Sequence, residues 1–489
     1  MAYSKSPTLD TYSSDRVPLY REMSTRDGGS SGKDEDYLNV FVEAVQGSAT
    51  GDKRKFLTKR AGTSVKVPSV ASSEIRGMFF WPDKYKLFYA VGSSIYIYNV
   101  STNTSTSITP FTSTTGHVGF CEYLYDTGTV VVVATDGTKL ITIDDSNTVV
   151  TCTDADLPTP HLPYPVFLDG YVFLAKQNSA EVYNSDLNNP MSWGADSFIQ
   201  AEMEADLVIR IAKVNNYLVV FGKETIEYFW DAAIEPPGSP LQRNDSPVKI
   251  NTYLAGFAIY GNSIYYIGTN SGGQADVYML KDFKIENMGS PSVSRYLNNA
   301  QDTFPHWTGN ILACNGHVFY LITAGNTKSY VCDVETKHWT RWAFQNQNTF
   351  DVKYSISAVD AYNTESFFCL SENASTIYQL DQSLYQDVGV NFKCIITTEN
   401  NDFGTMNRKT MKRASIIGDR PPVDSNIKVQ WSDNDYQTFN TGVYTNLNQD
   451  NPCVYRLGSF RQRVFRLTHE DNAPLRLQEL EVDINKGIS

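Results

Sequence analysis

The sequence predicts an all-β protein built around a β-propeller of seven blades, with six blades as the alternative. The first observation is residues 215–231, NNYLVVFGKETIEYFWD, where two aromatic and β-branched strands flank a Gly222-Lys223 turn. The second is that this hairpin phrase recurs from about residue 75 to about residue 382, at starts roughly 40 to 55 residues apart. The third is a composition with 13% aromatic residues, including 30 Tyr, which favours strands. Because a four-stranded antiparallel sheet cannot bury both faces alone, consecutive sheets must stack around an axis.

Residues 1–70 are expected to form an N-terminal arm that docks on a partner. Most of this segment has loop composition, such as DGGSSGKDED, and only residues 37–42 are typical of a strand. Lys53, Arg54 and Lys55, together with Lys59 and Arg60, form a basic run that could contact phosphates. A solvated segment beside an acidic surface is the favoured alternative.

Residues 71–388 are assigned to the propeller, because each repeat in this range contains two to four short strands. Within a repeat, one strand ends at a small or turn residue and the next ends on an aromatic phrase. The seven predicted repeats span residues 75–102, 116–150, 165–197, 207–233, 256–297, 309–344 and 352–381. No segment keeps a 3.6-residue apolar period beyond two turns, so little helix is expected.

Residues 389–489 are expected to form a separate C-terminal β-sandwich. Their strands alternate between apolar and polar residues, which is typical of strands with one face in a core. The predicted strands are residues 392–397, 413–417, 426–431, 453–457, 463–467 and 475–482. With 489 residues, the chain exceeds the size at which one core usually stops growing, so at least two domains are expected.

The formal net charge of −13 is concentrated in the N-terminal and repeated part of the chain. Residues 1–390 carry 28 Lys and Arg against 42 Asp and Glu, whereas residues 391–489 carry 13 against 12. This acidity argues against a protein that coats nucleic acid without sequence preference. With no run of about 18 apolar residues and no signal-peptide profile, a soluble, non-secreted protein is expected. The seven Cys form no CxxC pair and are expected to be buried thiols.

No catalytic, cofactor-binding or metal-binding residues can be nominated from the sequence. The six His show no HxxH or HExxH spacing, and GxSxG, P-loop and GxGxxG motifs are absent. The pairs Asp144-Asp145 and Asp433/Asp435 stand in predicted turns, where Asp commonly accepts backbone N–H bonds. Residues 432–439, SDNDYQTF, are similar to the Asp-box of sialidase-like propellers, an architectural motif in which the Asp caps a turn. We therefore expect that the protein is not an enzyme.

One basic cluster near the C-terminus has a geometric basis: Arg456, Arg461, Arg463 and Arg466. Arg461 and Arg463 share one face of a predicted strand, and Arg456 lies on the preceding strand across Gly458. The cluster could bind phosphates or an acidic neighbour. Cross-strand pairing with local Asp or Glu is the favoured alternative.

Three phrases occur in order along the whole chain. They are GKDEDYLNVFVEAV followed by KRKFLTKRAGTSV, the hairpin NNYLVVFGKETIEYFWDA, and the ending CVYRLGSFRQRVFRLTHEDNAPLRLQELEVDI. Together they resemble one family, the packaged-DNA stabilisation or tail nozzle proteins of short-tailed bacteriophages. The family's hairpin pattern falls on residues 221–229, and its R-x-G-x-x-R ending falls on residues 456–461.

The resemblance implies a structural protein of the virion tail, present in the host cytoplasm during assembly. It implies six copies in a ring below the head-to-tail adaptor, with a needle or plug at the far end and spikes or fibres outside. The N-terminal arm would then dock on a neighbouring copy or on the adaptor. Double-stranded genomic DNA would cross the lumen without sequence-specific binding, retained before ejection and passed during it. No catalytic residue, cofactor or membrane-spanning segment is implied.

Two other function classes stay open on the residues alone. A propeller glycosidase or depolymerase acting on host surface glycan is favoured by the blades and the Asp-box-like turn, but no paired carboxylates can be placed on matching blade positions. A peptide-binding propeller would be expected to carry a WD or kelch motif, and neither is present.

Overall fold

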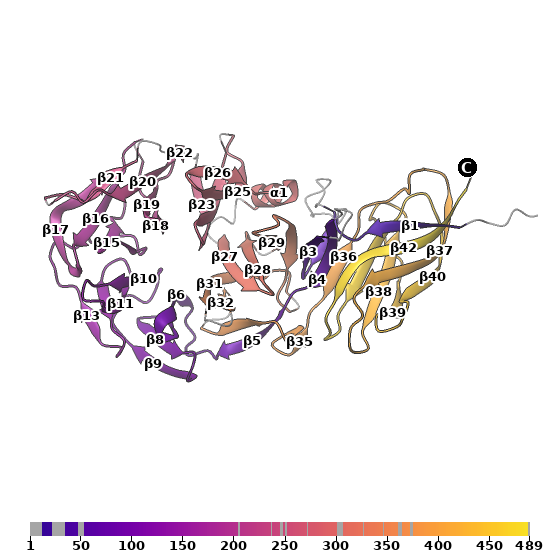
Figure 1. Cartoon of the computed structure of the whole chain (residues 1–489), viewed down its shortest axis with the longest axis horizontal. Helices are drawn as coiled ribbons and strands as arrows, with labels where there is room; N and C mark the ends of the chain where they lie inside the picture. The colour runs from indigo at the N-terminus through magenta and orange to yellow at the C-terminus, as the bar shows by residue number, and fades with distance from the viewer. Residues whose placement is uncertain are drawn as a thin grey trace, which may run out of the picture.

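A β-propeller and a β-sandwich lie next to each other in the computed structural model (Figure 1). The structure describes residues 12–21, 35–46, 53–203, 206–235, 237–244, 248–249, 252–270, 272–300, 307–325, 327–345, 347–359, 364–371 and 375–487. Within these ranges almost all regular structure is β-strand, as the composition predicts.

Blade 4 shows how the repeated phrase builds the propeller. Its strands are β18 (Arg210–Val214), β19 (Tyr217–Phe221), β20 (Thr225–Asp231) and β21 (Leu241–Arg243), and β22 (Val248–Lys249) also pairs with β20. Because successive side chains point to opposite faces, each strand supplies two cores. One face packs against blade 3 through Leu218, Val220 and Phe229. The other packs against blade 5 through Val219, Phe221 and Tyr228.

The described residues form seven four-stranded blades, so the expected seven-bladed propeller is confirmed (Figure 1). The first three blades are β6 (Ile75–Trp81), β7 (Lys86–Val91), β8 (Ser94–Asn99) and β9 (Thr104–Ile108); β10 (Gly119–Leu124), β11 (Val130–Thr135), β12 (Leu140–Ile143) and β13 (Val149–Thr151); and β14 (Val166–Leu168), β15 (Tyr171–Ala175), β16 (Glu181–Asp186) and β17 (Asn189–Gln200). Blades 5 and 6 are β23 (Thr252–Tyr260), β24 (Ser263–Thr269), β25 (Ala275–Lys281) and β26 (Lys284–Asn287); and β27 (Thr308–Cys314), β28 (His317–Thr323), β29 (Ser329–Asp333) and β30 (Trp339–Trp342).

Blade 7 is closed by a strand from the N-terminal part of the chain. It consists of β31 (Val352–Val359), β32 (Thr364–Leu370) and β33 (Ile377–Asp381), and β5 (Gly62–Val67) pairs antiparallel with β33. A Cβ at Gly62 would lie 2.2 Å from the backbone oxygen of Gln386, so this close approach requires glycine. The expected boundary at residue 70 is therefore wrong, because β5 belongs to the propeller.

The sandwich contains strands from both ends of the chain. One sheet runs β3 (Val40–Gln46), β4 (Lys53–Lys59), β42 (Arg476–Lys486), β37 (Lys409–Gly418) and β40 (Cys453–Phe460), and β1 (Ser13–Pro18) also pairs with β42. The other runs β2 (Asp36–Leu38), β36 (Cys394–Thr397), β41 (Val464–His469), β38 (Asn426–Ser432) and β39 (Val443–Asn446), and β2 continues it into β30 of blade 6. The short strands β34 (Gln386–Asp387) and β35 (Val390–Asn391) lie between propeller and sandwich, with β34 pairing with β5.

The described N-terminal strands are thus part of the sandwich rather than a separate arm. In Figure 1 the indigo strands β1, β3 and β4 lie among the orange and yellow C-terminal strands. The sandwich core also continues into the propeller, because one cluster of buried side chains joins Val482 and Leu467 to Tyr320 of blade 6. Strand pairing over more than 400 residues leaves no local pattern, which is why the sequence predicts an arm.

One helix was not expected at this length. Helix α1 (Pro291–Asn299) follows β26 and packs Val293 and Leu297 into the core shared with the sandwich. The Ser290 Oγ accepts a hydrogen bond from the Val293 N–H at 3.3 Å, and Pro291 occupies the first turn, where no N–H is needed. Its capping residues were a helix-start signal that the strand-based repeat assignment overlooked.

Candidate functional site

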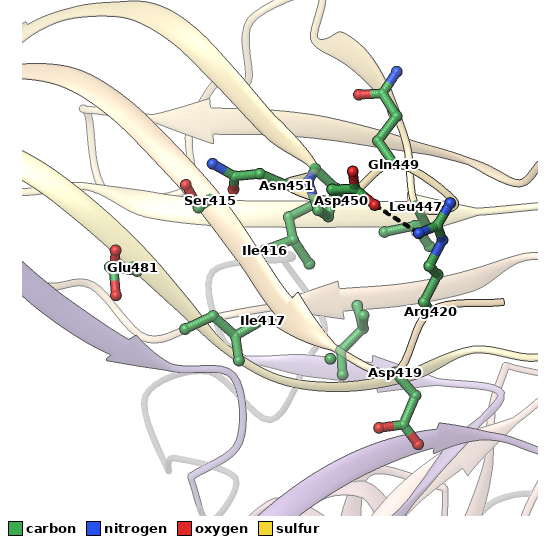
Figure 2. A pocket seen from close by; sticks show the side chains of 13 residues that line it. Ser415, Ile416, Ile417, Asp419, Arg420, Leu447, Gln449, Asp450, Asn451 and Glu481 are labelled. Carbon is green, nitrogen blue, oxygen red and sulfur yellow. Dashed lines mark hydrogen bonds and ion pairs between the residues drawn. The ribbon is translucent and has the colours of Figure 1, made fainter.

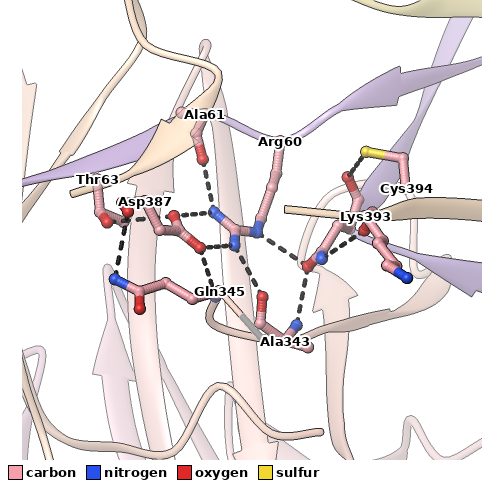
Figure 3. Close-up of polar contacts among 9 residues, drawn as sticks. Arg60, Ala61, Thr63, Ala343, Gln345, Asp387, Lys393 and Cys394 are labelled. Carbon is pink, nitrogen blue, oxygen red and sulfur yellow. Dashed lines mark hydrogen bonds and ion pairs between the residues drawn. The ribbon is translucent and has the colours of Figure 1, made fainter. Parts of the chain in front are cut away.

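The connection between β4 and β5 carries the chain from the sandwich into blade 7, and Arg60 is at its centre. The Arg60 side chain is completely buried, and each N–H of its guanidinium has an acceptor (Figure 3). Nε donates to Asn39 Oδ1 at 3.0 Å, Nη1 to Ala61 O at 2.9 Å and Nη2 to Ala343 O at 2.8 Å. The remaining two N–H groups donate to the Asp387 carboxylate, at 2.9 and 2.5 Å. This is the bidentate geometry in which an arginine ion pair is strongest.

Asp387 joins three segments that are distant in sequence. It also accepts hydrogen bonds from Thr63 Oγ1 of the closing strand, at 3.1 Å, and from the Gln345 N–H just after blade 6, at 2.9 Å (Figure 3). Asp387 itself lies in β34, where the chain leaves the propeller. A fully buried and fully hydrogen-bonded ion pair fixes one geometry, since any displacement leaves a charge without a partner. The junction between propeller and sandwich is therefore specified by Arg60 and Asp387.

Lys59, next to Arg60, is also buried. Its Nζ donates to Asp471 O at 2.8 Å and lies 4.6 Å from the centre of the Phe392 ring. Burial lowers the pKa of Lys59, since the surroundings disfavour the charged ammonium. Neither expectation for the basic run holds here: Lys59 and Arg60 do not face solvent, and they are not accessible to phosphates. Arg54 of the same run is exposed.

The blade 4 hairpin is held by a carboxylate that the sequence did not single out. Asp206 accepts hydrogen bonds from the N–H groups of Lys223, Glu224 and Thr225, and therefore caps the turn. Asp206 precedes the hairpin in a segment without regular structure, so no spacing rule marks it.

The glutamate of the family's hairpin phrase is buried on the same blade. The Glu227 carboxylate lies 2.8 Å from Arg243 Nε and accepts a hydrogen bond from the Met203 N–H at 3.0 Å. Burial raises the pKa of Glu227, because it disfavours the charged form of the carboxyl. Glu227 thus links β20 to β21 and to the segment before the blade, which is a structural role.

The Arg456–Arg466 cluster is divided by the structure, and its most buried member is paired locally. The Arg463 side chain has no exposed surface, and its Nε and Nη2 donate to Asp433 at 2.7 and 2.8 Å. Its guanidinium also lies 4.0 Å from the centre of the Phe460 ring. For Arg463 the favoured alternative, pairing with a local acidic residue, is confirmed.

The other arginines of this cluster point to different partners. Arg461 is exposed and donates to Met406 O at 2.7 Å. Arg466 lies 3.7 Å from the centre of the Phe439 ring, and burial lowers its pKa. Arg456 is exposed and has a φ of 60°, at an irregularity in the pairing of β40 with β37. The four arginines therefore do not form one phosphate-binding surface.

The Asp-box-like turn is architectural, but the roles of its residues differ from those expected. Asn434 Oδ1 accepts the hydrogen bond from the Thr438 N–H at 3.0 Å, so Asn434 caps the turn. Asp433 instead provides the counter-charge of Arg463. The Tyr436 ring is buried and its hydroxyl donates to Thr398 O at 3.1 Å.

The remaining acidic and histidine residues show no arrangement for acid–base or metal chemistry among the described residues. Asp145 pairs with Lys84 and Lys86, whose hydrogen bonds, that of Lys84 first, lower its pKa. Asp144 Oδ1 accepts the Thr148 N–H at 2.7 Å, as expected for a turn. Within the described part of the chain, no three His, Cys, Asp or Glu side chains are grouped to hold a metal ion. His306 lies outside the described residues.

A surface cavity of about 360 Å³ lies in the sandwich, between the end of β37, the loop before β40 and β42 (Figure 2). Arg420 and Asp450 pair across its rim at 2.7 Å, and both are largely exposed. Ile416, Ile417 and Leu447 form its apolar side. No nucleophile, acid–base pair or ligand set converges on it, so the cavity does not define a catalytic site.

The fold and this set of structural contacts agree with the result of a family comparison. The model of the family described as "Bacteriophage P22 Gp10, beta-propeller" matches residues 28–385, well over half of the chain. The chain belongs to this phage stabilisation family. A Gp10-type protein is a structural component of the phage tail nozzle. The match includes the Arg60 junction and the blade 4 hairpin, and it ends before the sandwich residues 389–489, where the third resembling phrase lies.

Other comparisons add the fold alone. Virginiamycin B lyase from Staphylococcus aureus has 10% identity and a TM-score of 0.43, covering 66% of this chain and 98% of its own. The Pan2 WD40 domain of Neurospora crassa has 8% identity and a TM-score of 0.42, covering 67% and 96%. The N-terminal domain of Nup159 has 13% identity and a TM-score of 0.39, covering 70% and 97%. No curated protein matches the sequence. In the described part of the chain, no helix has the length and apolar character needed to cross a membrane.

Proposed function

We propose that this Gp10-family protein is a tail nozzle protomer that forms a sixfold ring below the head-to-tail adaptor. The family match carries the proposal, since it makes the chain a structural protein of the tail. In the proposed ring, the lumen retains packaged double-stranded DNA and passes it during ejection. A needle or plug binds below, and spikes or fibres bind outside. The protein is assembled in the host cytoplasm and has no catalytic activity.

The charge distribution supports a lumen that does not hold DNA. Each phosphate neutralised by Lys or Arg adds salt-sensitive affinity, so a basic channel wall would slow DNA passage. Residues 1–390 carry 28 basic against 42 acidic residues. Two arginines that looked available for phosphates are buried in ion pairs, Arg60 with Asp387 and Arg463 with Asp433. Both are therefore unavailable to a nucleic acid.

An assembly experiment tests the ring directly. The purified chain is measured by native mass spectrometry and particle imaging, alone and after mixing with the adaptor ring, with an unrelated ring protein as the control. We expect a monomer or weak oligomer alone, and a sixfold ring only with the adaptor. A stable dimer that ignores the adaptor would contradict the proposal.

Deletion of residues 1–60 is not a suitable test, although the expected arm suggests it. The deletion removes β1, β3 and β4 from the sandwich sheet, together with Lys59 and Arg60 of the junction. Loss of assembly would then follow from loss of the fold.

A further inference from the structure

The innermost strands of the blades bring a group of aromatic and cationic side chains together at the propeller axis. His117, just before β10 of blade 2, has its Nδ1 3.0 Å from the hydroxyl of Tyr354 on β31 of blade 7. Blade 1 lies between these two blades, so such a contact is possible only near the axis. The His117 ring also contacts Tyr164, just before β14 of blade 3, with ring centres 5.1 Å apart. We call His117, Tyr164, Arg210, Phe257 and Tyr354 the axial cluster.

Arg210, the first residue of β18, is held between two rings of this cluster. Its guanidinium carbon lies 4.1 Å from the centre of the Tyr164 ring and 3.9 Å from the centre of the Phe257 ring. Rings on both faces leave only the edge of the guanidinium, with its N–H groups, to meet another molecule. The residue as a whole is half-buried, so part of it reaches solvent.

The hydrogen-bonding groups of Arg210 are not satisfied within the described residues. Its Nε is buried and has no hydrogen-bond acceptor there, and no carboxylate forms an ion pair with its guanidinium. Arg76, on β6 of blade 1, shows the contrast: its guanidinium donates to the carbonyl oxygens of Gly92, Ser113, Gly116 and Thr115. A buried donor without an acceptor is costly, and proteins keep one mainly where a ligand or ion satisfies it.

The axial cluster is also a region of positive charge in a chain of net charge −13. The pKa of His117 is lowered to about 3, by burial first and then by the charge of Arg210, with Arg76 and Lys353 adding to it. His117 is therefore neutral at pH 7, and Lys353 is paired with Glu74 at the surface. A cationic group concentrated on an axis attracts anions, although the rest of the molecule repels them.

We propose that the axial cluster binds a small oxyanion, a carboxylate or phosphate group, through the guanidinium edge of Arg210. A guanidinium offers two parallel N–H donors that match the two oxygens of such a group. The two rings fix the guanidinium plane, so little side-chain freedom is lost on binding. The site does not depend on ring assembly, and its test uses the free chain.

The test follows the melting temperature of the full chain during titration with sodium phosphate and, separately, sodium acetate. Sodium chloride at equal ionic strength is the reference. We expect a saturable rise with phosphate, acetate or both, and the probe that saturates at lower concentration identifies the preferred group. Arg210→Gln should weaken the apparent affinity at least tenfold, and Arg210→Lys should weaken it while keeping the charge. Arg466→Gln is the matched control, because Arg466 is also stacked on a ring but lies in the sandwich; it should leave the titration unchanged.

Two results would overturn the site. One is that neither probe raises the melting temperature beyond chloride in the wild type. The other is that Arg210→Gln and Arg210→Lys titrate as the wild type does. Circular dichroism of each variant at 20 °C shows whether it is folded, and Arg210→Lys provides the comparison if the glutamine variant does not fold.

Discussion

Replacing Asp387 by Asn should destabilise the propeller–sandwich junction far more than the same change at an exposed ion pair. The substitution keeps the size of the side chain but removes its charge, and it places an NH2 group against N–H donors. Asp387 Oδ1 accepts from Arg60 and Thr63, and Oδ2 accepts from Arg60 and Gln345. An amide can serve only the first pair, so two of the four hydrogen bonds are lost.

The magnitude follows from these contacts. Each hydrogen bond to a charged group contributes about 1.5 to 3 kcal/mol, and removing one partner of a buried ion pair costs about 3 to 5 kcal/mol. We expect Asp387→Asn to lower the unfolding free energy by about 3 to 5 kcal/mol. Asp450→Asn is the control, because Arg420 and Asp450 are 57% and 96% exposed and such pairs contribute about 0 to 1 kcal/mol.

Urea unfolding measured by tryptophan fluorescence gives the comparison. The buried Trp342 ring lies 6.0 Å from the Arg60 guanidinium, so its emission reports on the junction. Midpoints are compared at a common m-value, since a chain with two sheet systems need not unfold in one step. If Asp387→Asn shifts the midpoint no more than Asp450→Asn does, the structural role assigned to the junction is wrong. Arg60→Met combined with Asp387→Leu should recover most of the loss, because it leaves no unpaired charge.

Three further outcomes are expected. Asp433→Ala leaves Arg463 buried without its counter-charge and should cost about 2 to 4 kcal/mol in urea unfolding, more than the roughly 1 kcal/mol of a turn cap. Asp206→Asn should speed amide hydrogen exchange in the blade 4 turn at least tenfold by weakening its cap, and an unchanged rate would refute the capping role. Burial lowers the pKa of His469 to about 4, whereas an unfolded histidine titrates near 6.5, so its contribution is complete above pH 6.5 and falls as the pH drops towards 4. His469→Gln should therefore remove about 2 kcal/mol from the stability lost between pH 7 and pH 5, measured by urea midpoints at both values.

The parts of the fold that local patterns encode were predictable. All seven repeats overlap a blade, because each hairpin records its own turn and alternation in fewer than 50 residues. The N-terminal strands were not, since β4 shows its apolar side only when β42 is known to lie beside it. Helix α1 was obscured because its nine residues are short beside the strand signals on either side.

The candidate site divides in the same way. That the Asp-box-like turn is structural could be read from its residue types, but that Asp433 faces Arg463 could not, since they are 30 residues apart on different strands. Arg60 was noticed as a charge, and its burial depends on Asp387, which no motif connects to it. The axial cluster draws on five blades and has no sequence signature of its own.

The pairing of β1 and β4 with β42 also sets the order in which the chain can fold. β4 ends at Lys59 and β42 begins at Arg476, so more than 400 residues must be synthesised before these strands meet. At typical translation rates this takes roughly 20 to 80 s. During that time the hairpin of β3 and β4 keeps Phe41 and Leu57 without their native neighbours, and the propeller lacks its Arg60 junction. Closure of both parts is therefore a late, largely post-translational step, and the nascent chain is most prone to aggregate while it waits for its last strand.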